Sequence, residues 1–325
     1  MNIESKRNSD PGWKTLMKKR NFFNNILFHF NKAVKNWQLY VLLLPTLLYF
    51  LIMEYVPMYG LQMAFKNYMV SKGFTGSEWV GLKHFERFFD HILFWEILGN
   101  TIWLSLYELA TFPIAVIMAL LLNQIASSRF KRMVQTVTYA PFFISTVVLV
   151  GMLYLFLSPQ TGLINQLITA LGGDTIYFFG ESSWFRTIFV WSGVWQNLGW
   201  GMVIYLAALT GISPELHEAA VVDGANKLHR IWHIDLPGIM PTVSILFILT
   251  VGNLFNLGFE KAYLMQNPLN ISSAEIIQTY VYKKGLVGGQ FSYASAIGLF
   301  NSIINCILLV IVNSIARRMN RTSLW

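Results

Sequence analysis

Six long apolar runs limit the possible folds of this chain more strongly than any other feature of its sequence. They lie near residues 38–57, 99–122, 136–157, 187–210, 240–260 and 294–316. A helix needs about 20 apolar residues to cross the roughly 30 Å hydrocarbon core of a bilayer, and each run reaches that length. The pattern therefore predicts an all-α membrane protein with six transmembrane helices.

The composition supports this class. Apolar residues make up 54% of the 325 residues and charged residues only 12%, whereas soluble domains carry roughly 25% charged residues. The net charge of +8 is therefore interpreted first as a topology signal, because the basic N-terminal tail is mixed with Phe and Leu and no zinc-finger or RNA-binding motif is present. We expect membrane lipid around the chain and no nucleic-acid partner.

Lysine and arginine predict the orientation, because cytoplasmic segments carry an excess of both. With the N-terminus inside, the tail holds eight of them, residues 123–135 three, residues 211–241 two and the C-terminus three. These are 16 of the 24 basic residues. We therefore expect both termini in the cytoplasm of a multi-pass inner-membrane protein, with residues 211–241 on the same side.

Two amphipathic stretches flank the first run. Residues 23–37 alternate apolar and basic positions at helical spacing, as expected for a helix lying on the inner leaflet, and residues 82–95 repeat the pattern on the other side. Both are interpreted as scaffold. The expected organisation is a cytoplasmic tail with an interfacial helix over 1–37 and a transmembrane domain over 38–325.

The polar segment 211–241, named here the elbow, has an internal order of its own. Ser213-Pro214 predicts a helix start, since Ser caps helices and Pro fits the first helical position. Gly224 should interrupt that helix, and Leu236-Pro237 should end a second one, because proline does not continue a helix interior. The prediction is a helix-Gly-helix turn at a membrane face.

This spacing resembles the signature cytoplasmic loop of the membrane subunits of ABC importers. The residues that match are Glu218-Ala219-Ala220, Asp223-Gly224 and Ile234-Asp235-Leu236-Pro237. In that family the loop docks on an ATP-hydrolysing subunit, so the resemblance assigns ATPase coupling to Glu218, Ala219, Ala220, Asp223, Gly224, Ile234, Leu236 and Pro237. Three positions depart from the carbohydrate-importing branch, Leu228, Ile231 and Asp235, and are interpreted as changes in packing.

The resemblance covers nearly the whole chain, including Tyr55-Val56-Pro57-Met58-Tyr59-Gly60 and Tyr139-Ala140-Pro141-Phe142-Phe143. It is nearest to importers of polysaccharide fragments such as alginate and other oligouronates. It implies a second homologous permease, two ATP-binding subunits, a solute-binding protein and a saccharide substrate. No Gly-x-x-x-x-Gly-Lys-Ser/Thr loop occurs, so ATP and Mg would bind the partner ATPase and this chain is expected to hold no cofactor and to be non-catalytic.

A sugar path needs aromatic faces for pyranose rings and amides for hydroxyl groups. Buried amides are costly in a membrane and should face a cavity or another helix. The candidates for the path are Trp191, Trp195, Gln196, Asn197, Asn253, Asn256 and Asn301. A role in joining helices explains any single Asn equally well.

Glu108 is the most anomalous charge, since a mid-membrane carboxylate costs about 2.5–3.5 kcal/mol on insertion scales. An interhelical hydrogen bond is the simpler interpretation, and proton coupling in a stand-alone secondary transporter is the rival function. A membrane-embedded enzyme is a further rival, but no nucleophile motif supports it. His229 and His233 have zinc-like spacing without a completing ligand, and Cys306 is alone, so no metal site is predicted.

Overall fold

The computed structural model describes residues 35–320. The chain divides into two compact units, Met1–Gln62 and Met63–Trp325. Within the first, α3 (Trp37–Phe50), the π-helix η1 (Leu51–Tyr55) and α4 (Val56–Met58) follow one another and bury no residue. The predicted interfacial helix 23–37 falls almost wholly outside the described residues. The domain boundary expected at residue 38 stays a prediction.

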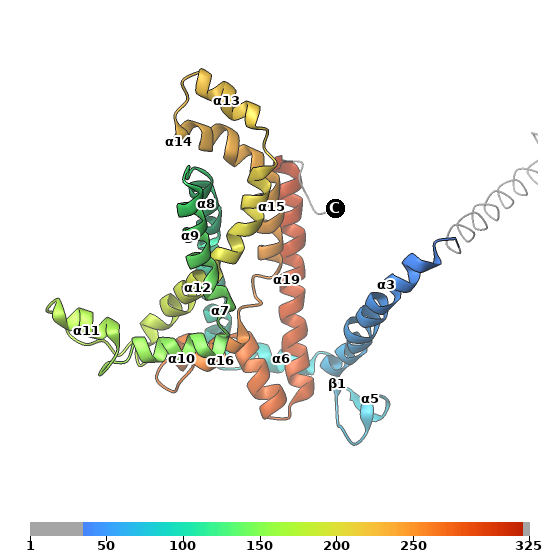
Figure 1. Cartoon of the computed structure of the whole chain (residues 1–325). Helices are drawn as coiled ribbons and strands as arrows, with labels where there is room; N and C mark the ends of the chain where they lie inside the picture. The colour runs from blue at the N-terminus through green and yellow to red at the C-terminus, as the bar shows by residue number, and fades with distance from the viewer. Residues whose placement is uncertain (1–34, 321–325) are drawn as a thin grey trace, which may run out of the picture. The chain divides into compact units, whose positions relative to one another are not determined.

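Four described helices are long and apolar enough to cross a membrane. They are Trp37–Phe65, Phe94–Asn123, Lys227–Gly252 and Phe291–Arg318. The second consists of α7 (Phe94–Ala110) and α8 (Phe112–Asn123), and the last belongs to α19 (Phe291–Asn320). Figure 1 shows α19 as a long straight helix beside α15 (Leu236–Gly252).

The third predicted span, 136–157, is not one straight helix. The chain forms α9 (Ser128–Tyr139), the 3-10 helix η3 (Ala140–Phe143) and α10 (Thr146–Phe156), and the two halves meet at 101°. Pro141 is the second residue of η3, and the Ser145 hydroxyl accepts the Val148 N–H to start α10 in a new direction. A proline and a new N-cap so close together explain why the apolar run bends.

The fourth predicted span lies within α12 (Ser182–Thr210), a helix of 29 residues. Its length suffices for a membrane, but α12 is not among the four helices that are both long and apolar enough, and Gln196 and Asn197 lie in its middle. The described chain thus has four apolar spans, or five if the bent pair is one span. The count of six is not confirmed.

Three clusters of buried side chains hold the second unit together. Leu120, Met202 and Ile239 belong to the cluster that joins α8, α12 and α15. A second cluster joins the first half of α12 to α16 (Phe259–Met265), and a third contains Phe88 and Tyr293, from α6 (Lys83–Phe89) and α19. Helix α12 contributes to two of the clusters. Its remaining faces line the cavities described below.

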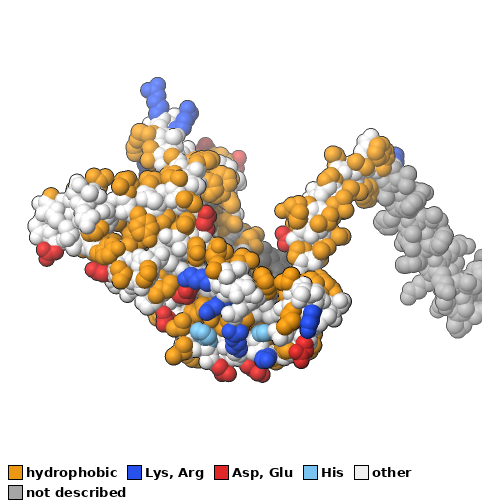
Figure 2. All heavy atoms as spheres, turned by 90° about the horizontal axis from the view of Figure 1, so that it is seen from below, with side chains coloured by type: hydrophobic (Ala, Val, Ile, Leu, Met, Phe, Trp, Pro, Cys, Tyr) orange, Lys and Arg blue, Asp and Glu red, His pale blue; other side chains and the backbone are white. Residues whose placement is uncertain are grey.

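The two ends of α19 carry different structures. The helices α13 (Pro214–Val222) and α14 (Lys227–Arg230) lie at one end, and α6 and α16 at the other (Figure 1). The second end also carries α5 (Gly73–Gly76), α17 (Ile271–Ala274), α18 (Ile277–Tyr282), the π-helix η5 (Lys283–Val287) and the antiparallel pair β1 (Lys66–Asn67) and β2 (Glu78–Trp79). The 3-10 helix η2 (Tyr59–Phe65) precedes β1 in the sequence. Figure 2 shows Lys, Arg, Asp, Glu and His side chains gathered on that end.

The helix predicted over 82–95 is shorter than expected. Helix α6 ends at Phe89, and α7 begins at Phe94. Phe88 is buried among aromatic rings, whereas Ile92 lies between the helices and is 90% exposed. The apolar spacing of 82–95 therefore marks two helices and a turn.

Candidate functional site

The elbow begins where α12 ends. The Ser213 hydroxyl accepts the Glu215 N–H and Pro214 is the first residue of α13, as the capping pattern predicts. Helix α13 buries none of its residues. It is therefore a short helix that is capped at its first turn and leaves its side chains accessible along its whole length.

Gly224 makes the turn between α13 and α14. Its φ of +78° lies in the left-handed region, which residues with a Cβ rarely adopt. Across the turn the Ala225 N–H donates to the Ala220 carbonyl oxygen at 2.8 Å, and the Asn226 side chain accepts the His229 N–H to cap α14. The sequence thus places a glycine at the one position where the turn needs it.

The second helix of the elbow does not stop at Pro237, contrary to the sequence prediction. Helix α14 continues through a π-helical turn, η4 (Ile231–Asp235), into α15. A π turn widens the helix locally and frees it from the regular hydrogen-bond ladder. Pro237 therefore fits in the first turn of α15, where its missing N–H is tolerated.

Large apolar side chains are exposed on the elbow. Val222 is 87% exposed, and Leu216, Leu228 and Trp232 are also largely exposed. Of the predicted coupling residues, Glu218, Ala219, Asp223, Gly224 and Pro237 are exposed, whereas Ala220, Ile234 and Leu236 are half-buried. Contiguous exposed apolar surface rimmed by polar residues is typical of a protein interface.

Asp235 is a structural centre of the elbow that sequence reasoning missed. Its side chain is fully buried. From the sequence alone, this residue is interpreted as a mere change in packing. Gln124, just after α8, donates to its Oδ2 at 2.7 Å, and His217 Nε2 of α13 lies 3.3 Å from its Oδ1. The carboxylate thus ties the exposed helix α13 to the end of a membrane helix.

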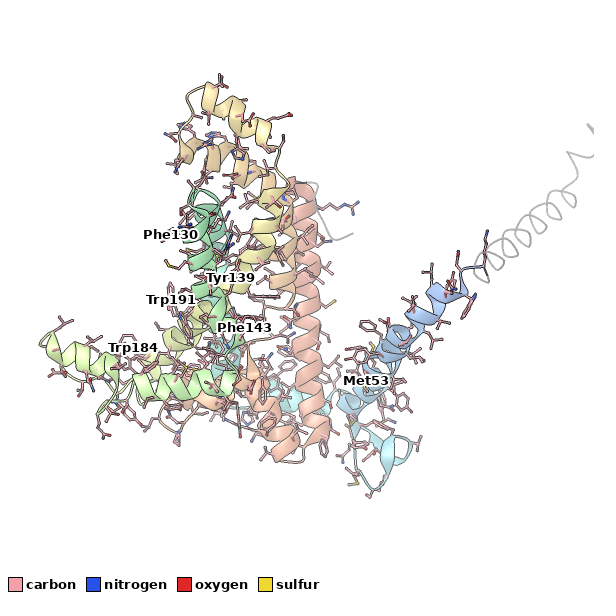
Figure 3. The ribbon with its side chains drawn as sticks, in the orientation of Figure 1. Met53, Phe130, Tyr139, Phe143, Trp184 and Trp191 are labelled. Atoms are coloured by element: carbon pink, nitrogen blue, oxygen red, sulfur yellow. The ribbon has the colours of Figure 1, made fainter. Side chains whose placement is uncertain are left out.

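Helix α12 separates the predicted path residues onto two faces. Residues 193, 196 and 197 share one face at helical spacing, and 191 and 195 share the neighbouring one. The second face lines an apolar groove of about 490 Å³ together with Leu149, Phe156, Ile188 and other residues of α10 and α12. Figure 3 shows Trp184 and Trp191, which both line this groove.

The two indoles of the candidate path therefore face apolar side chains. Trp191 Nε1 donates to the Tyr107 hydroxyl at 2.8 Å, and Trp195 lines the same groove. Trp200, on the next turn, stacks on Phe142 with ring centroids 4.7 Å apart. The groove suits an apolar occupant better than a polyol.

Gln196 and Asn197 instead face a polar cavity of about 480 Å³. Its walls come from α7, η3, the start of α10, α12 and α16. Gln196 Nε2 donates to the Ile144 carbonyl oxygen at 2.7 Å, and Asn197 Nδ2 donates to Gly193. The lining residues are Glu108, Phe142, Ile144, Ser145, Thr146, Phe189, Val190, Gly193, Gln196, Asn197, Gly258, Phe259, Glu260 and Lys261.

Glu108 lines this cavity and two neighbours of about 370 and 350 Å³. Within residues 35–320 its carboxylate makes no hydrogen bond to another side chain, so the interhelical bond expected from the sequence is absent there. Asn253 and Asn256 line the 370 Å³ cavity, and buried Asn301 donates to Asn256 Oδ1 at 3.3 Å. The structure thus brings Glu108 close to the amides of α12 and of the segment after α15.

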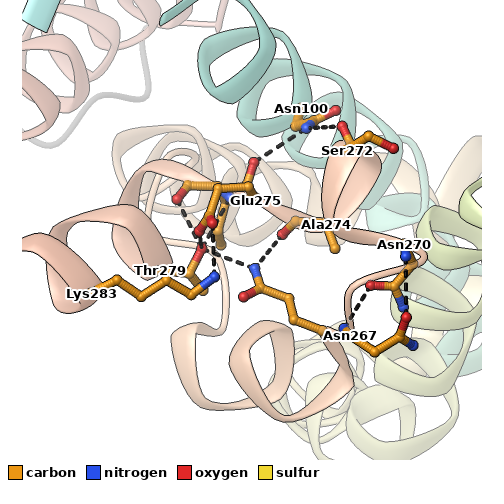
Figure 4. Close-up of polar contacts among 10 residues, drawn as sticks. Asn100, Asn267, Asn270, Ser272, Ala274, Glu275, Thr279 and Lys283 are labelled. Atoms are coloured by element: carbon orange, nitrogen blue, oxygen red, sulfur yellow. Dashed lines mark hydrogen bonds and ion pairs between the residues drawn. The ribbon is translucent and has the colours of Figure 1, made fainter. Parts of the chain in front are cut away.

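A separate polar network stiffens the loops at the far end of α19. Glu275 pairs with Lys283 at 2.7 Å and accepts the Thr279 hydroxyl at 2.6 Å, while Asn100 donates to the carbonyl oxygens of Ser272 and Glu275 (Figure 4). The charge of Lys283 is therefore neutralised by Glu275. This network supports the loops and lines none of the cavities above.

Together, apolar membrane helices, an exposed elbow and a polar cavity among the helices define a membrane transport subunit. Residues 111–321 match the family described as binding-protein-dependent transport system inner membrane component, and the chain belongs to that family. It is 45% identical over 288 residues to protein LplB of Bacillus subtilis, covering 88% of this chain and 91% of that one.

Two further comparisons cover most of the chain. It is 42% identical over 295 residues to the polygalacturonan/rhamnogalacturonan transport system permease protein YteP of Bacillus subtilis, covering 90% of this chain and 92% of the relative. It is also similar to a chain in the crystal structure of a bacterial alginate ABC transporter in complex with an alginate pentasaccharide-bound periplasmic protein. That match has a TM-score of 0.84 and 37% identity, and it covers 91% of this chain and 99% of the other.

Proposed function

We propose that this chain is the membrane permease of an ABC importer that moves oligosaccharides, and specifically oligouronates, into the cytoplasm. The observation that carries the proposal is the likeness over nine-tenths of the chain to a transporter of the acidic polysaccharide alginate. A relative at 42% identity is a permease for polygalacturonan and rhamnogalacturonan. Both relatives handle acidic polysaccharides, so the shared substrate class is an oligomer that carries carboxylates.

The working complex would contain a second homologous permease, two ATP-binding subunits and a solute-binding protein. ATP and Mg would bind the ATPases, and this chain would supply the membrane path and the elbow. The exposed apolar side chains of α13 and α14 fit docking on an ATPase. Closing the ATPases around ATP would then displace the elbow and turn the bundle from inward-facing to outward-facing.

Proton-coupled transport through Glu108 is the weaker alternative. Membership of the binding-protein-dependent family and the likeness to an alginate ABC transporter favour an energy source on a separate ATPase. The Glu108 side chain also lines two cavities. A carboxylate there can contact a substrate without transferring protons. We therefore assign Glu108 to the substrate path.

ATP hydrolysis in the reconstituted complex tests both the coupling and the substrate class. Oligogalacturonate with the binding protein should stimulate hydrolysis, and a Gly224→Leu complex should lose about 5-fold or more of that stimulation, the lower limit of typical coupling energies. Gly289→Leu is the matched control, because Gly289 also has a positive φ (+67°) and open space at its Cβ but lies outside the elbow. Equal losses in both variants would refute coupling at Gly224, and stimulation by a peptide alone would refute the saccharide.

A further inference from the structure

Lys261 occupies an unusual position for a lysine. The side chain is only 8% exposed and belongs to α16, between two of the membrane-length helices. Its Nζ donates to the Phe189 carbonyl oxygen at 2.5 Å and lies 4.6 Å from the centre of the Phe189 ring. Gly193 makes room for it, since a Cβ there would lie 3.1 Å from Nζ.

The ammonium group has more hydrogen-bonding capacity than the protein uses. An ammonium has three donors, and a single carbonyl acceptor is described for this one. Among residues 35–320 no carboxylate oxygen lies within 4.0 Å of Nζ, the limit for an ion pair. A buried charge without a direct counter-ion is costly, so an anion that reached the ammonium would be stabilised by it.

The cavity that Lys261 lines also carries Glu108 and Glu260. Glu108 balances the lysine charge from beyond ion-pair distance, which keeps the ammonium tolerable when the cavity contains only water. An arriving carboxylate would form the close ion pair that Glu108 does not form. Repulsion from both glutamates would keep binding weak enough for release, as conduction requires.

The remaining lining suits a sugar ring. Gln196 and Asn197 each donate an N–H to the backbone, and their amide oxygens suit hydroxyl donors. Phe142, held flat against Trp200, adds an aromatic wall. About 480 Å³ is within the range of small-ligand pockets.

We propose that Lys261 is a carboxylate-binding residue of the translocation path, which pairs with the uronate groups of the substrate while Glu108 serves as its resting counter-charge. The inference rests on the proposed import of oligouronates. It distinguishes Lys261 from Lys283, which Glu275 already neutralises, and from Lys284, which lies outside the cavity beside Tyr280.

Binding of trigalacturonate and of its methyl ester to the purified complete complex, without the binding protein, tests this assignment. Esterification should weaken binding to the wild type at least about tenfold, because it removes a charge-assisted hydrogen bond. Lys261→Gln should weaken acid binding by a similar factor and should bind acid and ester alike. Lys284→Gln, the charge-matched control, should keep the wild-type preference for the acid.

Assembly and basal ATP hydrolysis show whether the Lys261→Gln complex is intact. If it is not, Glu108→Gln provides the second variant: removal of a repelling carboxylate should tighten binding of the acid and leave the ester unchanged. An acid preference that persists in Lys261→Gln, or fails to rise in Glu108→Gln, overturns the role of Lys261 alone. A wild-type complex stimulated only by neutral oligosaccharides overturns the oligouronate class as well.

Discussion

Gly199 permits a close approach of two helices, and replacing it by alanine should separate them. A Cβ at this position of α12 would lie 2.5 Å from the carbonyl carbon of Thr138 and 2.8 Å from Tyr139 Cα, both backbone atoms at the end of α9. Ordinary contact begins at 3.4 Å, so the overlap is about 1 Å and no side-chain rotation removes it. The two helices must move apart or bend.

Overpacking of this kind costs about 1–3 kcal/mol, and a clash with backbone places Gly199→Ala near about 3 kcal/mol. At roughly 2–4 °C per kcal/mol for chains of about 150–250 residues, Tm should fall by roughly 6–12 °C. The movement would also shift η3, whose Phe142 forms a wall of the polar cavity, so oligouronate-stimulated ATP hydrolysis should fall together with Tm.

Heating the purified complex and following its loss from size-exclusion chromatography measures the effect. Gly201→Ala is the matched control, because that Cβ would lie 3.5 Å from Ala115 Cβ, an ordinary contact. It is on the same helix, two residues away, and should melt close to the wild type. A Gly199→Ala complex that melts within about 2 °C of the wild type would refute the argument from close approach.

The two remaining predictions concern the elbow and the topology. Asp235→Ala should leave the two partners of the carboxylate unpaired at a cost of about 1–3 kcal/mol and should speed amide hydrogen exchange in α13; unchanged exchange would show that the buried carboxylate does not hold that helix. In a Cys306→Ser background, cysteines at Ser5 and Ser323 should resist an impermeant thiol reagent applied to intact cells, because the basic-residue bias places both termini inside, and labelling of either would contradict the orientation.

The membrane class and the elbow could be predicted from local patterns. The length of an apolar run can be counted directly in the sequence. Ser213 and Pro214 favour a helix start and Gly224 favours a turn because of their own side-chain and backbone chemistry. The predicted bounds failed where the chain leaves the regular α-helix: Pro141 lies in a run that bends by 101°, and Pro237 lies in a helix that continues through a π turn. A proline restricts the backbone, but neighbouring turns decide whether the helix ends, bends or widens.

The candidate site was less predictable because its members come from distant parts of the sequence. Trp191 and Gln196 are close neighbours on one helix, yet they face different cavities. Asp235 was interpreted as a packing change, although it binds Gln124 across more than a hundred residues. No local signal indicates that Lys261 is buried against Phe189.

The amino-acid sequence alone was enough to establish a helical membrane subunit, to indicate its family and to locate its elbow. Hydropathy, capping and glycine geometry depend on residues close together in the sequence, so the features they produce can be predicted without the tertiary structure. The folded chain was needed to show which lysine forms a close ion pair: Lys283 lies 2.7 Å from Glu275, whereas Lys261 faces a cavity. Charge pairing and burial depend on distances between helices, and these distances follow from packing rather than from any local pattern.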